Sequence, residues 1–105
     1  MRPLAPSDLS TAARMLLVLP DADRVAVMGR VISEAEAADR YRKRIGQAHP
    51  FWGNGSLEAA ARARPLAPPR KFSDSDYLAC IALALDVVLV HRRCATHSCN
   101  KALIA

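Results

Sequence analysis

The chain has 105 residues, 51% of them hydrophobic and only 5% aromatic, and carries a formal net charge of +5 at pH 7. This length allows no more than one domain, whose small core is marginal on its own. No long apolar run follows Arg2, as a signal peptide would require, and the three cysteines fit no secreted disulfide framework. We therefore expect a cytoplasmic protein.

The charge is distributed unevenly along the chain. Residues 1–39 carry four basic and six acidic side chains, residues 40–71 carry eight basic and one acidic, and residues 72–105 carry three of each. The whole excess therefore lies in the central third. Such an asymmetry indicates a polyanion partner, although a solvated basic face that keeps the protein soluble is an equally common explanation.

The first predicted helix spans residues 7–19, where Leu9, Leu16 and Leu19 form an apolar stripe and Pro20 ends the segment. A short corner leads into the next helix, so we expect an angled or antiparallel hairpin. We do not expect a helix-turn-helix DNA reader, because Asp21 and Asp23 would present two acids to the phosphates.

The second predicted helix spans residues 21–45. Asp21 is its expected cap, and Gly46 its expected stop, since glycine takes the left-handed conformation easily. Opposite charges lie four residues apart in the pairs Arg30–Glu34, Glu36–Arg40 and Asp39–Lys43. The apolar stripe recurs at helical spacing; its members are Val25, Met28, Ile32, Ala35, Ala38, Tyr41 and Ile45.

An aromatic loop follows at residues 47–55 and contains Phe51 and Trp52. Two interpretations stay open: the rings plug the end of the core, as lone tryptophans often do, or they anchor a partner. A short third helix is predicted over residues 56–64, capped by Ser56, and a proline-rich, polyproline-like connector spans residues 65–71.

The last predicted helix begins at Ser73, with Asp76 as a capping partner. Its run of fourteen residues, 77–90, has only Asp86 charged and is shorter than the roughly 20 residues of a membrane-spanning helix. It is apolar nearly all round, and a helix of this kind must be covered on every face. We therefore expect a homo-oligomer that forms through Leu78, Ile81, Leu85, Val88 and Leu89.

The C-terminal segment carries a metal-like pattern of His91, Cys94, His97 and Cys99. Structural zinc sites usually take ligand pairs from two separated segments, and here all four lie within nine residues, so we expect no bound metal and no cofactor. No catalytic triad, phosphate-binding glycine loop or paired-carboxylate site can be assembled, and we expect no enzyme. The expected organisation is an all-α domain at residues 1–93 with a flexible tail at 94–105.

Three stretches resemble one protein family: the opening MRPLAPSDL, the run AEAADRYRKRIGQAHPFWGNGSLEAAA at residues 35–61, and SDYLACIALAL at residues 75–85. They look like the small first protein of gene transfer agent clusters, which is the small terminase of phage-like particles that package host DNA. The resemblance covers roughly residues 1–90 and fails after His91.

The resemblance implies a non-enzymatic packaging factor that forms oligomeric rings, binds double-stranded DNA and delivers it to the large terminase, the ATPase and nuclease. Phage members commonly carry an N-terminal helix-turn-helix for their packaging site; the expected absence of such a reader here departs from that pattern and fits weak DNA binding without strong sequence choice. It supplies no residue-by-residue DNA site. From charge alone we expect the DNA contacts at Arg40, Arg42, Lys43, Arg44, Arg62 and Arg64.

The surface that meets the large terminase has two candidates, the loop residues Phe51 and Trp52 and the C-terminal residues His91, Arg92 and Arg93. We favour the C-terminal ones, because a terminal segment can reach a partner while the helices stay in the oligomer. The alternative function is a helical adaptor that binds another protein through the aromatic loop. A small zinc-binding regulator that uses the tail is a third hypothesis.

Overall fold

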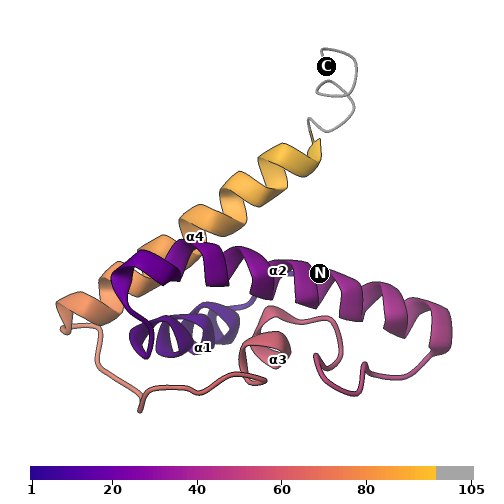
Figure 1. Cartoon of the computed structure of the whole chain (residues 1–105), viewed down its shortest axis with the longest axis horizontal. Coiled ribbons are helices and arrows are strands. Elements are labelled where there is room, and N and C mark those ends of the chain that lie inside the picture. Colours follow the sequence, from indigo (N-terminus) through magenta and orange to yellow (C-terminus); the bar gives the residue numbers. More distant parts are fainter. Residues whose placement is uncertain (97–105) are drawn as a thin grey trace.

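The computed structural model describes residues 1–96 and is all-helical over that range, which confirms the predicted fold class (Figure 1). Within these residues it has no strand, and its helices are α1 (Pro6–Leu17), α2 (Asp21–Ile45), α3 (Leu57–Ala61) and α4 (Ser75–Thr96). No helix in the described part of the chain is both long enough and apolar enough to cross a membrane.

The corner between α1 and α2 is fixed by Arg24. Its Nε donates to two carbonyl oxygens, that of Leu16 at 3.0 Å and that of Leu19 at 3.2 Å. The Leu16 oxygen also accepts from Leu19 N–H, at 3.0 Å. Its guanidinium also pairs with Asp21 at 2.6 Å. Asp21 is therefore not the cap we expected, and Pro20 occupies the N-cap position without a side-chain hydrogen bond. Beyond this corner, α1 packs chiefly against α3 and α4.

Helix α2 ends as predicted, because Gly46 takes the left-handed conformation with φ of 83°. The middle of its apolar stripe is buried, at Met28, Ile32, Ala35 and Ala38. The two ends are not: Val25 is 59% and Ile45 is 53% exposed. A helix of 25 residues is about 38 Å long, and the other helices of this small domain cover only its centre.

Asp8 ties α3 to α1. Its buried carboxylate accepts from the backbone N–H of Ala5 at 2.6 Å and from that of Glu58 at 2.9 Å. It therefore satisfies one backbone donor at the N-terminal end of each helix. Ser56 caps α3 as predicted and accepts from Ala59 N–H at 3.1 Å. The helix ends at Ala61, earlier than expected.

Helix α4 begins two residues later than predicted, and its first turn is capped by Asp74, whose carboxylate accepts from Tyr77 N–H at 3.1 Å. Tyr77, Cys80, Ala84 and Val88 form its buried stripe. Figure 1 shows that the C-terminal half of α4 rises away from the other helices. The helix continues to Thr96, past the expected domain end at residue 93; the rest of the expected tail, with His97 and Cys99, lies outside the described residues.

All four helices contribute to one core cluster, in which small side chains alternate with a few large ones. Its buried members are Ala12, Ala13, Met15 and Leu16 from α1, Met28, Val31, Ile32 and Ala35 from α2, Leu57, Ala60 and Ala61 from α3, and Tyr77, Cys80, Ala84 and Val88 from α4. The alanines let the helices approach closely, and in exchange each buries little apolar area.

Candidate nucleic-acid interface

The acidic residues of α2 pair with different partners from those that their spacing predicts. Glu34 binds the guanidinium of Arg64 through both carboxylate oxygens, one of them 2.9 Å from Nη2. Glu36 accepts from Nε2 of His91, at 2.6 Å, on α4. Of the three expected pairs along the helix, only Asp39–Lys43 forms, at 3.1 Å.

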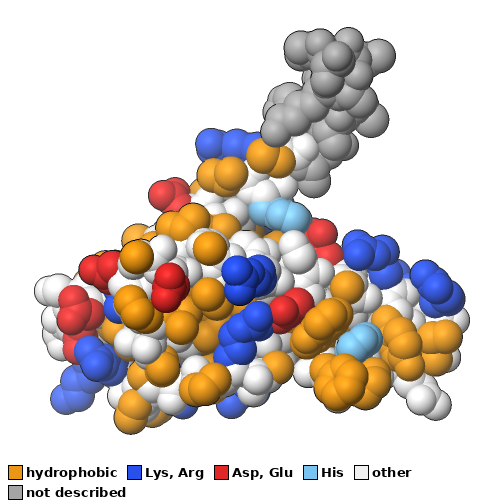
Figure 2. All heavy atoms as spheres, in the orientation of Figure 1, with side chains coloured by type: hydrophobic (Ala, Val, Ile, Leu, Met, Phe, Trp, Pro, Cys, Tyr) orange, Lys and Arg blue, Asp and Glu red, His pale blue; other side chains and the backbone are white. Residues whose placement is uncertain are grey.

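These long-range pairs leave three arginines of α2 facing solvent. Arg30, Arg40 and Arg44 are exposed, and none has an ion pair within residues 1–96. At about 100° per residue they lie within an arc of about 80°, and at about 1.5 Å per residue they span roughly 21 Å. We call this row of residues 30, 40 and 44 the α2 ridge. Figure 2 shows basic side chains gathered over the C-terminal end of α2, at the right of the molecule.

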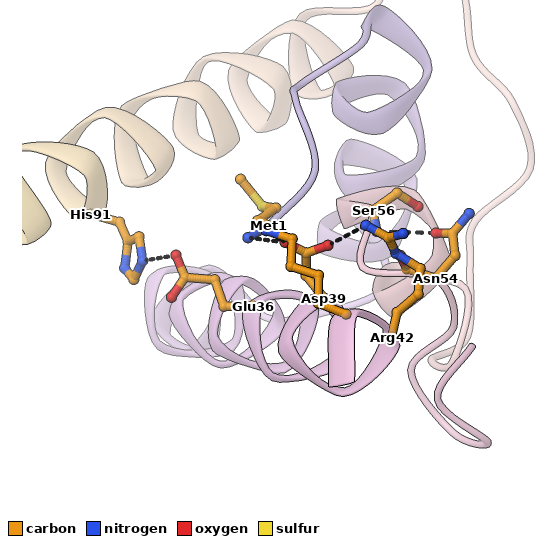
Figure 3. A network of polar contacts seen from close by, with 8 residues as sticks. Met1, Glu36, Asp39, Arg42, Asn54, Ser56 and His91 are labelled. Carbon is orange, nitrogen blue, oxygen red and sulfur yellow. Dashed lines mark hydrogen bonds and ion pairs between the residues drawn. The ribbon is translucent and has the colours of Figure 1, made fainter. Parts of the chain in front are cut away.

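Asp39 holds the other two basic residues of this helix end. Its side chain is 6% exposed and contacts Arg42 at 3.0 Å and the N-terminal ammonium of Met1 at 3.5 Å (Figure 3). It also contacts Lys43, at 3.1 Å. Burial alone would raise the pKa of Asp39, but the hydrogen bonds from Lys43 and Arg42 outweigh it and lower the pKa from 3.8 to about 2.

Arg42 has a second structural contact, because its Nε donates to the backbone oxygen of Asn54 at 3.1 Å and so fixes the aromatic loop to α2 (Figure 3). Arg62 pairs with Glu58 at 3.0 Å, and that hydrogen bond lowers the pKa of the Glu58 carboxyl. The hydrogen bond to Glu34 raises the pKa of the Arg64 guanidinium.

The six basic residues predicted to bind DNA therefore do not form one surface. Arg42 and Arg64 make contacts that hold separate segments together. Arg62 and Lys43 are exposed and each pairs with an acid four residues away, whereas Arg40 and Arg44 are exposed and have no ion pair among residues 1–96. Arg30 was not predicted to bind DNA, because Glu34, four residues further on, suggested an ion pair with it. Glu34 instead contacts Arg64, so Arg30 is not paired with Glu34.

The aromatic loop is built around His49. Its Nδ1 accepts from the backbone N–H groups of Phe51 and Trp52 at 3.1 and 3.2 Å, and its backbone pairs with Gly53. The Trp52 ring stacks on the imidazole with centroids 4.7 Å apart and an interplanar angle of 8°. Trp52 is half-buried in this stack and lies outside the core cluster, so it does not plug the core. Phe51 is 76% exposed.

Tyr41 joins the loop to the α2 ridge. Its ring meets His49 edge to face, with centroids 5.0 Å apart, and it directly follows Arg40 and precedes Arg44 by three residues on the same helix. Figure 2 shows hydrophobic side chains beside the basic side chains at the C-terminal end of α2. The C-terminal part of the ridge, at Arg40 and Arg44, therefore adjoins the aromatic loop.

The predicted oligomer interface on α4 is divided between the core and the surface. Val88 is 1% exposed inside its own core, so it is not available to a second copy, and Ile81 is partly buried against that core. Leu78, Leu85 and Leu89 are exposed. We call these three residues the outer stripe of α4.

The opposite edge of α4 carries an apolar groove of about 440 Å³ that the sequence did not suggest; it is lined by Val25, Leu83, Asp86, Val87 and Val90.

The expected docking residues at the end of α4 differ in accessibility. His91 is half-buried through its bond to Glu36, whereas Arg92 and Arg93 are exposed. Cys94 is an exposed thiol and Cys80 a buried one, whose pKa is raised by burial. Within the described residues no three potential ligands are placed to hold a metal ion, and two members of the proposed zinc set, His97 and Cys99, lie beyond them.

Residues 2–88 match the model of a protein family described as a domain of unknown function, DUF7742. No curated protein and no solved structure matches the chain.

Proposed function

We propose, for a chain that belongs to the DUF7742 family, a role as a small-terminase-like protein that binds double-stranded DNA with little sequence preference and delivers it to a large terminase for packaging into phage-like gene transfer particles. The proposal rests on the resemblance over residues 1–90 and on the α2 ridge. In this role the chain is a DNA carrier, and the ATPase and nuclease chemistry belongs to the large terminase.

The α2 ridge is the observation that carries the proposal. Arginines that already pair with an internal acid must give up that pair to bind a phosphate, whereas Arg30, Arg40 and Arg44 have no such pair among the described residues. Phosphate contacts supply affinity without reading sequence, and a few of them give weak, salt-sensitive binding. Three guanidinium groups on one helix face fit that mode of binding.

The first turn of α2 argues against a sequence-reading role for that end of the helix. Asp21 and Asp23 are both exposed there, and a recognition helix contacts DNA with its N-terminal residues. The basic end of α2 is its C-terminal end, so the helix fits contact with the DNA backbone rather than insertion into the major groove.

Delivery requires a surface for the large terminase, and we propose that Arg92 and Arg93 at the end of α4 provide it. They are exposed on the part of α4 that rises away from the other helices (Figure 1). The competing surface is the aromatic loop with Phe51 and Trp52, whose exposed phenylalanine also favours the alternative function of a protein–protein adaptor.

The test compares two triple variants with the same change in net charge. Arg30→Ala, Arg40→Ala and Arg44→Ala remove the ridge, whereas the control, Arg2→Ala, Arg62→Ala and Lys71→Ala, removes three exposed basic residues elsewhere. At about 50 mM salt we expect the ridge variant to lose about tenfold or more in affinity for duplex DNA, and the slope of log K against log salt to fall by about 3. We expect the control to lose much less.

Equal losses in both variants would mean that binding follows net charge alone and that the ridge is not the interface. If the wild-type protein binds no duplex DNA at low salt, the DNA-packaging function is wrong. Circular dichroism of both variants checks that the helices remain folded.

A further inference from the structure

We propose that the aromatic loop binds an unpaired DNA base, which stacks on Phe51 while the α2 ridge holds phosphates of the same strand. This inference rests on the proposed DNA binding and specifies the form of DNA: a single strand, an overhang or a frayed end. Bases inside a duplex are stacked on their neighbours and offer no face to a protein ring, so intact duplex would use the ridge alone.

The exposed ring is held in place before any ligand arrives. The His49–Gly53 bridge and the two N–H groups donated to His49 Nδ1 fix the loop backbone on both sides of Phe51. The Phe51 ring also contacts the imidazole, with centroids 5.8 Å apart, and still leaves 76% of the residue exposed. A fixed aromatic ring loses little conformational freedom when a base stacks on it.

The charge around this ring favours a polyanion over an apolar protein segment. Tyr41 connects the loop to Arg40 and Arg44, and the nearby acid, Asp39, is buried and paired with Arg42 and Lys43. Single-stranded DNA binders combine the same two features, a basic track for the backbone and aromatic rings on which bases stack.

Phe72 offers an internal comparison. It is 68% exposed and directly follows Lys71, but Arg70 pairs there with Asp74 at 3.1 Å and Asp76 lies two residues further on. The surroundings of Phe72 therefore have no excess of positive charge. If an exposed phenylalanine were sufficient, Phe51 and Phe72 would contribute equally to DNA binding. Base stacking next to bound phosphates also needs an excess of positive charge, which is present near Phe51 and absent near Phe72.

The experiment compares an oligodeoxynucleotide with an abasic strand of the same length, which has the same phosphates and no bases. By fluorescence anisotropy we expect the full-length protein to bind the normal strand at least about fivefold more tightly. Phe51→Ala should remove this difference without weakening the abasic complex, and Phe51→Trp should retain it. Phe72→Ala should behave like the wild type.

Other outcomes separate this inference from the function on which it rests. Equal binding of normal and abasic strands would overturn base stacking and leave the DNA-carrier role intact. Wild-type affinity in Phe51→Leu would also overturn it, because an aliphatic side chain keeps an apolar contact but offers no ring. Loss of large-terminase capture in Phe51→Ala, with DNA binding unchanged, would make the loop a protein-docking surface instead. Failure to bind duplex, normal and abasic strands alike would refute the proposed function itself.

Discussion

Asp39 links α2, the aromatic loop and the basic residues beside the α2 ridge through one buried carboxylate. It anchors Arg42, which in turn holds the backbone of Asn54 (Figure 3). The end of the aromatic loop lies so close to α2 that a Cβ atom on Gly55 would be 2.7 Å from the Cα atom of Asp39. Because a buried carboxylate without cations is strongly unfavourable, Arg42 and Lys43 must remain near Asp39, and this arrangement holds the loop against the helix.

The first prediction concerns Asp39→Asn. The pKa of Asp39 falls from 3.8 to about 2 on folding, so the ionised form stabilises the fold by about 2 kcal/mol. A lowered folded-state pKa gives stability that is complete above about pH 4 and is lost as the pH falls toward 2. We expect urea denaturation at pH 7 to show a free energy of unfolding about 2 kcal/mol lower in the variant, and a smaller difference at pH 3.

Asp86→Asn is the control for this measurement, since Asp86 is exposed and makes no ion pair among the described residues. Its free energy of unfolding should stay close to the wild-type value at both pH values. A difference for Asp39→Asn that is the same at pH 7 and pH 3 would show that packing, rather than charge, explains its effect.

Two glycines, one in helix α2 and one in the loop that follows it, differ in whether the structure has room for a side chain. Gly29 lies inside the helix, and a Cβ atom there would meet nothing within 4 Å. Gly55 has φ of +95°, and a Cβ atom there would meet the backbone and side chain of Asp39. In the helix, glycine only adds freedom to the unfolded chain; in the loop, it is what permits the close approach to α2.

The second prediction follows from this contrast. Gly29→Ala should raise the free energy of unfolding by about 0.5–1 kcal/mol, because alanine favours the helix. Gly55→Ala should lower it by at least about 1 kcal/mol, because alanine resists a positive φ and must also displace Asp39. Denaturant titration of both variants measures the two effects, and a Gly55→Ala protein as stable as the wild type would contradict this view of the loop.

At the scale of the whole molecule, the four helices leave apolar surface uncovered on α4. Leu78, Leu85 and Leu89 recur at seven- and four-residue steps, the spacing of helices that pair along one seam. We keep the prediction that copies of the chain associate through this outer stripe. The stripe is on α4 and the ridge on α2, so we expect an oligomer formed through the stripe to leave the ridge arginines exposed.

The third prediction is that Leu85→Lys reduces self-association and that Ala79→Lys does not. Both positions are exposed on α4, but residue 79 lies about 100° away from the stripe around the helix. Light scattering at micromolar concentration should give a smaller mass for Leu85→Lys than for the wild type and for Ala79→Lys. A folded wild-type monomer at that concentration would refute the proposed oligomer.

Local signals in the sequence predicted the four helices and the all-α fold, although α3 ends earlier and α4 begins later than expected. Pro20 separates α1 from α2, Gly46 ends α2 and Ser56 caps α3, as predicted. These signals are local: a proline lacks an N–H group, a glycine accepts the left-handed conformation, and a serine satisfies a nearby backbone donor. The continuity of the aromatic loop with the basic end of α2 could also be anticipated, because they adjoin in sequence.

Long-range contacts determine which charged and which apolar side chains remain exposed. Glu34 pairs with Arg64, 30 residues away, and Glu36 with His91, 55 residues away, and these contacts leave Arg30 and Arg40 without an ion pair among residues 1–96. Val88 enters the core while Leu85 and Leu89 stay outside, because α1 and α2 cover one side of α4. Spacing along a helix specifies which residues share a face, but the partner of that face is set by segments distant in sequence.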